Sequence, residues 1–283
     1  MSKVGIVTDS TNCLPQEVLQ EYDIRVVPVG FTIEGKTYWD TEISSNDFWK
    51  LFKEAKELPT TNAVTPGTFT DIFNDLANTT DNIVCILVSK ALSATNSVAV
   101  KAGEMIKEEH PDLKIEIVDS KTSAGALGFI VMEAAKAAKA GKSLEEVVQV
   151  AEEMIPRVKF VCGMNTMKYL IKSGRAPKSA YIGEFLQIKP IIGMVSGTGL
   201  VESMGRVNGS KKTMTKLTEM VKDHIDTSKP IHLMVHYTDD IKTGEELKEY
   251  ATSVYDCAEV HLTPYSPVMA SATGPVVSLS FYS

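Results

Sequence analysis

The sequence predicts an α/β protein of two domains, one with a doubly wound, mainly parallel sheet and one with a mixed or antiparallel sheet. Strand patterns alternate with helix patterns through the first half, which is typical of parallel strands joined by crossover helices. This pattern changes after Pro156, and residues 276–281 alternate like an antiparallel strand. We therefore place the domains at residues 1–157 and 158–283, a division that suits a chain of 283 residues.

Apolar runs and their flanking residues predict the elements of the first domain. The Thr65-Pro66 pair and the capping box of Ser143 and Glu146 each indicate the start of a helix. The Gly35-Lys36 pair predicts a hairpin turn. Strands are expected at residues 3–8, 24–31, 83–88 and 114–118. Helices are expected to open near residues 14–17 and at 65, to span 45–56, 93–109 and 143–155, and to include one that ends near residue 140.

The second domain shows a less regular alternation. Glycines punctuate residues 193–209, which therefore read as a turn-rich region. Strands are expected at residues 158–162, 231–236, 259–262 and 276–281, and helices at 166–173, 211–225 and 244–255.

Composition and charge exclude several classes of protein. The formal net charge of -7 argues against a nucleic-acid-binding surface, which needs a basic stripe, and against anionic membranes. No apolar run approaches the roughly 18 residues of a membrane span, and residues 1–4 lead into a strand without a signal-peptide pattern, so we expect no stable membrane insertion. The four cysteines show no CxxC spacing, and Cys85 lies in an apolar run, which predicts reduced thiols and a cytoplasmic protein.

Three hydroxyl-rich segments follow predicted buried strands: residues 8–11, 89–97 and 119–123. In an open parallel sheet, ligands bind beyond the carboxyl ends of the strands, where such loops converge. Neutral hydroxyls suit a small anionic or carbonyl head group, whereas metals prefer carboxylate, imidazole or thiolate ligands. The histidines also lack metal-ligand spacing, and His232 and His236 would lie roughly 13 Å apart on a strand. We expect neither a metal nor a cofactor.

The fingerprints of nucleotide-binding proteins and hydrolases are missing. Gly197-Thr198-Gly199 lacks the third glycine of a dinucleotide loop, and Gly141-Lys142-Ser143 joins two helices instead of following a strand. There is no GxSxG elbow around a nucleophilic serine. Arg175 and Arg206 lie in short basic segments that fit either a functional contact or an ordinary helix end or solvated face.

Several segments, taken in order, resemble the DegV family of bacterial fatty-acid-binding proteins. Ser89-Lys90-Ala91-Leu92-Ser93-Ala94-Thr95 resembles the family's Ser-Ser-Gly-Leu-Ser-Gly-Thr loop, and Thr61 and Pro66 match its Thr-Ser-Gln-Pro-Ser-Pro segment. The series continues with Val7-Thr8-Asp9-Ser10, Val118-Asp119-Ser120-Lys121, Gly174-Arg175, Ile188-Lys189-Pro190-Ile191, His236 and Thr273-Gly274-Pro275. These segments span nearly the whole chain, and their order is more specific than any one of them.

The resemblance implies a long-chain fatty acid bound between two domains, with its carboxylate presented to a separate ATP-dependent fatty-acid kinase. The acyl phosphate would feed phospholipid synthesis, and the chain itself would have no catalytic residue. One departure concerns the histidine that precedes Thr-Gly-Pro in many members and helps bind the head group, because this position is Ala272 here. Two glycines of the serine loop are also replaced, by Ala91 and Ala94.

The expected site follows from both lines of reasoning. A buried carboxylate needs hydrogen bonds, which the hydroxyls of Thr61 and Ser93 and the helix start near Ser93 would supply. Ser10, Asn96 and Thr273 complete the expected ligand contacts, and Arg175 and Arg206 are expected to contact a partner or phosphate. Tunnel candidates, as easily ordinary core, are Phe160, Met164, Met167, Leu170, Ile182, Phe185, Leu186, Ile191 and Met194. The alternative is a stand-alone enzyme that uses Ser93 or Ser10 on a small acyl or phosphorylated substrate.

Overall fold

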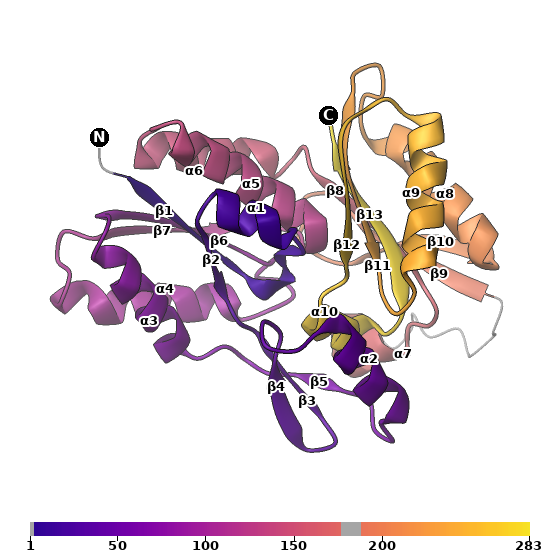
Figure 1. Ribbon diagram of the computed structural model, residues 1–283, viewed down its shortest axis with the longest axis horizontal. Coiled ribbons are helices and arrows are strands. Elements are labelled where there is room, and N and C mark those ends of the chain that lie inside the picture. Colours follow the sequence, from indigo (N-terminus) through magenta and orange to yellow (C-terminus); the bar gives the residue numbers. More distant parts are fainter. Residues whose placement is uncertain (1–2, 177–187) are drawn as a thin grey trace.

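The computed structural model describes residues 3–176 and 188–283. Its first sheet has the strand order β2-β1-β6-β7, and all neighbouring strands are parallel (Figure 1). These strands are β1 (Val4–Asp9), β2 (Ile24–Val27), β6 (Asn82–Leu87) and β7 (Lys114–Asp119). The predicted mainly parallel sheet is confirmed.

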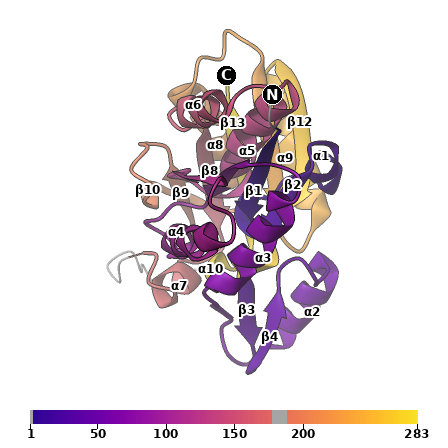
Figure 2. The same cartoon turned by 90° about the vertical axis from the view of Figure 1, so that its left-hand side faces the viewer.

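Helices cover both faces of this first sheet, as expected for a doubly wound fold (Figure 2). One face carries α3 (Pro66–Ala77) and α4 (Thr95–Met105), and the other carries α5 (Ala124–Lys139) and α6 (Leu144–Met154). The Thr65 side chain caps α3, and Ser143 and Glu146 form the predicted capping box of α6. Shorter elements are η1 (Ser10–Asn12), α1 (Gln16–Glu21) and η2 (Ile106–Glu108).

The second large sheet is mixed, as predicted, with the order β10-β9-β8-β13-β11-β12. Only the β11–β12 pair is parallel among the neighbouring strands of this described sheet. Its strands are β8 (Lys159–Met164), β9 (Ile188–Met194), β10 (Glu202–Asn208), β11 (Ile231–Tyr237), β12 (Cys257–Pro264) and β13 (Val276–Tyr282). Two helices, α8 (Ser210–His224) and α9 (Ile241–Val254), pack on its outer face, and α5 and α10 (Pro267–Thr273) lie on the inner side (Figure 1).

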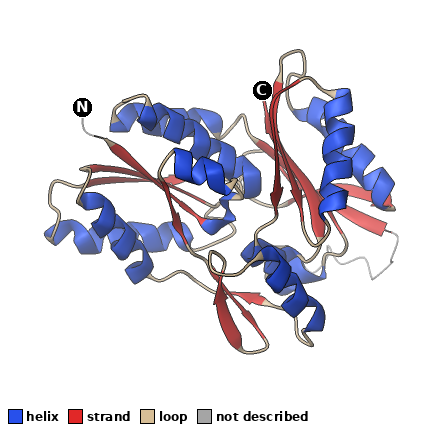
Figure 3. Cartoon of the chain, in the orientation of Figure 1, coloured by secondary structure: helices blue, strands red, loops and turns tan. Residues whose placement is uncertain are grey.

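A third, small sheet has the order β4-β3-β5 and lies below the first two beside α2 (Figure 3). It contains β3 (Gly30–Ile33), β4 (Lys36–Trp39) and β5 (Thr60–Thr61), and α2 spans Ser45–Glu54. The single strand expected at residues 24–31 is wrong, because the segment forms β2 and β3 in different sheets. Pro28 lies between them, and its missing N–H and fixed φ disfavour a continuous ladder.

Two further expectations for the second half are corrected. The turn-rich region at 193–209 is largely a hairpin, in which β9 and β10 pair around a glycine-containing loop. The helix α10 was missed because it is short and buried on all sides, so it shows no amphipathic period. The helix α7 (Lys168–Lys172) is shorter than expected. The proposed domain boundary at residue 157 falls between α6 and β8.

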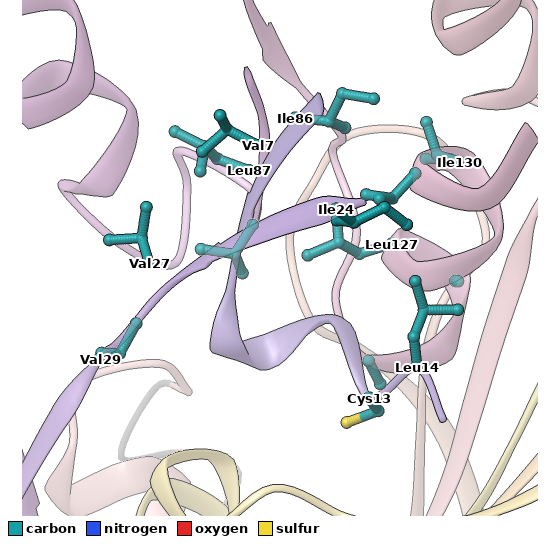
Figure 4. Close-up of a cluster of buried hydrophobic side chains, with 14 of the residues drawn as sticks. Val7, Cys13, Leu14, Ile24, Val27, Val29, Ile86, Leu87, Leu127 and Ile130 are labelled. Atoms are coloured by element: carbon teal, nitrogen blue, oxygen red, sulfur yellow. The ribbon is translucent and has the colours of Figure 1, made fainter. Parts of the chain in front are cut away.

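One continuous core joins α5 to strands of both large sheets. Figure 4 shows part of it, with Val7 of β1, Ile24 of β2, Ile86 of β6 and Leu127 of α5 labelled. The inner face of the second sheet contributes to the same core, so the two sheets are fixed around a shared helix. Within the described residues, no helix has the length and apolar character needed to cross a membrane.

Candidate functional site

A cavity of about 90 Å³ lies between the carboxyl edge of the first sheet and the inner face of the second. Thr11 follows β1 and Val88 follows β6, and both line this cavity. From β1 the chain continues outward to β2, and from β6 it continues outward in the opposite direction to β7. The carboxyl edge between β1 and β6 is therefore a topological switch point. Ligands of doubly wound proteins bind at such points, so the cavity lies where the fold predicts a site.

The loop between β6 and α4 supplies hydroxyls to the cavity. Ser93 Oγ lies 2.7 Å from Thr95 Oγ1 and accepts a hydrogen bond from the Thr95 N–H at 3.3 Å. The Ser93 hydroxyl thus bonds locally two residues on, and α4 begins at Thr95 and not at Ser93 as expected. The first turn of α4 therefore faces the same region with backbone N–H groups that lack partners within the helix.

Arg175 forms the opposite side of this polar end of the cavity. It follows α7, which Gly174 ends with a φ of 75°, and its backbone N–H donates to the Leu170 carbonyl at 3.0 Å. Its side chain crosses to the first half of the chain: Nε donates to the Leu92 carbonyl at 3.1 Å, and Nη2 donates to Thr61 Oγ1 at 3.3 Å. These contacts fix the guanidinium beside the hydroxyl-rich loop.

The charge distribution in the cavity is simple. Among the described residues that line it, Arg175 carries the one formal charge. Burial lowers the pKa of its guanidinium, which nevertheless remains protonated at neutral pH. Among the residues that the structure describes, no carboxylate forms an ion pair with it, and its side-chain acceptors are neutral oxygens of Leu92 and Thr61. A partly desolvated cation in this setting favours an anionic ligand.

The rest of the cavity is mainly apolar and comes from the second half of the chain. Strands β8 and β9 contribute Phe160, Ile192 and Met194, and the region of α10 contributes Tyr265 and Met269. Methionine side chains adapt their shape readily, which suits a wall that must fit a flexible apolar chain. The remaining lining residues are Val29, Asn62, Leu92, Ser123, Leu170, Val201, Val268, Ala272 and Thr273.

The α10 wall is held in place by a buried carboxylate from the first half. Asp40 Oδ1 accepts a hydrogen bond from the Val268 N–H at 2.8 Å, at the start of α10. Burial, with a smaller contribution from Asp9, raises the pKa of Asp40 to about 7. Asp40 thus joins the two walls of the cavity and titrates in the neutral range.

Three of the expected ligand residues, Thr61, Ser93 and Thr273, line the cavity. The other two do not. Ser10 Oγ accepts a hydrogen bond from the Val29 N–H at 3.1 Å, and Asn96 Nδ2 donates to the Val88 carbonyl at 2.7 Å. Both side chains form hydrogen bonds that connect neighbouring segments, and neither lines the cavity.

The two arginines expected at a partner or phosphate contact lie in different environments. Arg175 is part of the cavity wall instead of an open surface, whereas Arg206 is exposed on β10 and does not line the cavity. Of the tunnel candidates, Phe160, Leu170 and Met194 line it. Met164, Met167 and Ile191 are buried elsewhere in the core, and Ile182, Phe185 and Leu186 lie outside the described residues.

His236, one of the residues that carried the family resemblance, does not line the cavity. Its Nε2 accepts a hydrogen bond from the Gly125 N–H at 3.1 Å in the first turn of α5, and its Nδ1 lies 2.7 Å from Thr263 Oγ1. Complete burial lowers its pKa to about 3, so the ring is neutral. His236 therefore joins the second sheet to α5 and helps position Ser123, which precedes that helix on the cavity wall.

Sequence reasoning missed much of the apolar wall, including the lining residues of α10 and Val201. A signal for α10 was present, because Ser266-Pro267 places a capping residue type before proline and Gly274 follows the last helical residue. The lining role of Val201 had no local signal. In the described part of the chain, no group of three histidine, cysteine or acidic residues is placed to hold a metal ion.

The comparisons with known proteins agree with this architecture. The model of the DegV family of uncharacterised proteins matches residues 3–283. A DegV domain-containing protein of Caldanaerobacter subterraneus subsp. tengcongensis is 33% identical over 225 residues, covering 79% of this chain and 78% of that protein.

Two solved structures share the fold over almost the full length. A DegV lipid binding protein from Thermotoga maritima has a TM-score of 0.90 at 23% identity, covering 99% of this chain and 98% of that chain. A fatty-acid-binding DegV family protein from Thermus thermophilus has a TM-score of 0.89 at 26% identity, covering 99% of both chains. The chain belongs to the DegV family.

Proposed function

We propose that this protein binds one long-chain fatty acid in the cavity between its two large sheets. The observation that carries the proposal is the position of Arg175, the one charged residue among the described lining residues, beside a hydroxyl-rich loop at one end of a mainly apolar cavity. The carboxylate lies against Arg175, Thr61 and Ser93, and the acyl chain extends along Phe160 and Met194. The fatty acid bound by the Thermus thermophilus relative supports this ligand class.

The energetics favour a ligand that has both a long apolar chain and a carboxylate. Burying about fifteen methylene groups gains on the order of 12 kcal/mol before ordering costs are subtracted. The carboxylate adds little to affinity unless charged hydrogen bonds replace its hydration. Arg175 and the two hydroxyls offer those bonds, so the site distinguishes an acid from an equally long neutral lipid.

The protein is a carrier in this proposal, with no catalytic residue of its own. In the described structure, the hydrogen-bond partners of Ser93 Oγ are the hydroxyl and N–H of Thr95, and neither group can act as a general base. The four cysteines are free thiols, which suits the reducing cytoplasm.

The proposal includes presentation of the carboxylate to a separate ATP-dependent fatty-acid kinase, leading towards phospholipid synthesis. The family resemblance supports this step, as does the position of Arg175 at the half-buried polar end of the cavity. Ala272 lines the cavity at the position where the family resemblance implies a histidine, so a methyl group stands there in place of a hydrogen-bond donor. Phosphorylation of the bound fatty acid by an added kinase therefore tests directly whether this protein works with a kinase.

Solvent extraction and mass spectrometry of the purified protein test the ligand. The expected result is about one fatty acid per chain. Recovery of a nucleotide or a sugar phosphate in that amount contradicts the proposal. In a second assay, the loaded protein is mixed with ATP and a fatty-acid kinase. Retained lipid without acyl phosphate formation would leave a carrier that is uncoupled from the kinase.

A further inference from the structure

The loop that joins β9 to β10, residues 195–201, closes one side of the cavity. Its last residue, Val201, lines the cavity and packs against the core that both halves of the chain share. The preceding residue, Leu200, is 55% exposed. The same short loop therefore presents one apolar side chain to the ligand space and one to the outside.

Hydrogen bonds within this loop and to Glu202, the first residue of β10, brace it. Glu202 Oε1 accepts from the Ser196 N–H at 3.2 Å and from Ser196 Oγ at 2.7 Å. Thr198 Oγ1 accepts from the Leu200 N–H at 3.3 Å. A loop braced in this way moves as a body about its ends, because its own bonds need not break when it shifts.

The loop is attached to the first half of the chain by a neutral hydrogen bond. Ser89 Oγ donates to the Gly199 carbonyl at 2.8 Å. Ser89 itself is firmly held, since its N–H donates to the Thr122 carbonyl at 2.9 Å and its side chain is buried. The other polar connection near this side of the cavity, made by Arg175, involves a charged donor, and such bonds are roughly twice as strong. A second charged donor, Lys159 Nζ of β8, donates to the Val195 carbonyl at 3.1 Å at the base of the loop. The neutral Ser89–Gly199 contact, farther along the loop, is thus weaker than either charged contact.

Gly199 allows the close approach that this contact requires. It has a φ of 80°, and a methyl group on it would overlap Ser89 Oγ. Gly197, two residues earlier, has a similar φ of 76°, but a methyl group there would meet nothing within 4 Å. An alanine at either position would strain the backbone, but only an alanine in place of Gly199 would also disturb the contact with Ser89. Comparing the two variants therefore isolates the effect of that contact.

We propose that residues 195–201 form a flap that lifts to let a fatty acid in and out, and that the Ser89–Gly199 hydrogen bond is its latch. This inference rests on the proposed function. The cavity of about 90 Å³ is smaller than the roughly 300–1,000 Å³ of common ligand pockets, so a long chain requires its walls to separate. The Ser89–Gly199 contact of this flap is neutral, whereas the charged contact of Lys159 with the Val195 carbonyl holds the flap at its base.

The test compares four proteins: wild type, Ser89→Ala, Gly199→Ala and Gly197→Ala. Stopped-flow fluorescence follows transfer of cis-parinaric acid, a fluorescent fatty acid, between protein and phosphatidylcholine vesicles. Gly199→Ala should accelerate uptake and release by at least about tenfold, and Ser89→Ala by about two- to tenfold, the range for loss of one neutral hydrogen bond. Gly197→Ala should remain within about twofold of wild type.

A latch affects both directions of transfer, whereas general loosening of the site raises release without raising uptake. Amide hydrogen exchange across residues 195–201 reports the latch without any ligand, and it should rise in Gly199→Ala and not in Gly197→Ala. If the two glycine variants behave alike in both assays, the flap inference is overturned and lipid binding stands. If the wild type takes up no fatty acid, the proposed function falls and the role of the flap as a lipid gate falls with it.

Discussion

The two walls of the cavity differ in chemistry. The wall from the first half of the chain carries the hydroxyls of Thr11, Ser93 and Thr95, which follow parallel strands or start a helix, and of Thr61 in the small antiparallel sheet. The wall from the second half is built from β8, β9 and α10 and is mainly apolar, with Arg175 at its edge. The first wall therefore suits a head group and the second an acyl chain.

This division has a structural cause. Loops at the carboxyl ends of parallel strands expose backbone N–H groups and small polar side chains. The inner face of a sheet covered by helices exposes side chains of one apolar face instead. A ligand with a charged end and an apolar body matches the junction of the two, and a ligand that lacks either part leaves one wall without a partner.

The largest expected effect of substitution is on the apolar wall. Phe160 is 2% exposed, so Phe160→Ala removes a buried ring and should lower the free energy of unfolding by about 3–5 kcal/mol. Denaturant unfolding measures this change. Ser93→Ala on the polar wall is the matched control and should cost less than about 1.5 kcal/mol. Equal losses of unfolding free energy in both variants would show that the apolar wall does not contribute more to stability than the polar wall.

The contact that joins the walls should respond to pH. The pKa of Asp40 is about 7 in the folded protein and about 3.9 in the unfolded chain, so the folded state binds the proton more tightly. The contribution of Asp40 to the free energy of unfolding is therefore fully present below about pH 4 and is lost as the pH rises through about 7.

Asp40→Asn keeps an acceptor for the Val268 N–H and removes this titration. Between pH 5 and pH 8, wild type should lose on the order of 2 kcal/mol more stability than the variant. Unfolding curves at the two pH values give the difference, and Asp9, which faces the same region, is present in both proteins. Parallel profiles would mean that Asp40 does not titrate in this range.

The cation at the edge of the apolar wall should dominate recognition of the head group. Arg175→Ala should weaken fatty-acid binding by roughly a hundredfold, near the upper range for hydrogen bonds to a charged group. Equilibrium titration measures the affinity. Arg206→Ala is the control, because Arg206 is exposed on β10 away from the cavity, and its affinity should equal that of wild type. A loss of affinity in both variants would indicate a long-range charge effect in place of direct contact.

The smallest expected effect is that of a single hydroxyl on the polar wall. Ser93→Ala should weaken binding by roughly tenfold if the hydroxyl donates to the carboxylate, and Thr61→Ala by a similar factor. Titration of both variants against the same fatty acid tests this. Wild-type affinity in both would place the head group at another part of the cavity.

The sequence was a good guide to the polar wall because its features are local. A strand pattern followed by hydroxyl residues identifies a carboxyl-end loop, and Thr65-Pro66 and Ser143 identify helix starts. Which hydroxyls face the cavity depends on the path of each loop in space. Ser10 and Asn96 therefore look equivalent to Ser93 in the sequence but bind neighbouring backbone groups.

The apolar wall was harder to predict because its residues carry no distinguishing local pattern. Phe160 and Met164 are both buried on one strand, yet Phe160 lines the cavity and Met164 does not. Arg175 could be placed at a helix end, but its contact with Thr61 joins residues 114 positions apart. Such long-range contacts depend on how the two halves pack against each other.

The most direct test of this account compares a fatty acid with its methyl ester in wild type and Arg175→Ala. The ester keeps the acyl chain and removes the negative charge, so it probes the apolar wall alone. Wild type should bind palmitic acid roughly a hundredfold more tightly than methyl palmitate. In Arg175→Ala the ratio should fall by at least about tenfold, with affinity for the ester unchanged. An undiminished preference for the acid in the variant would contradict the assignment of the carboxylate to Arg175 and the division of the two walls.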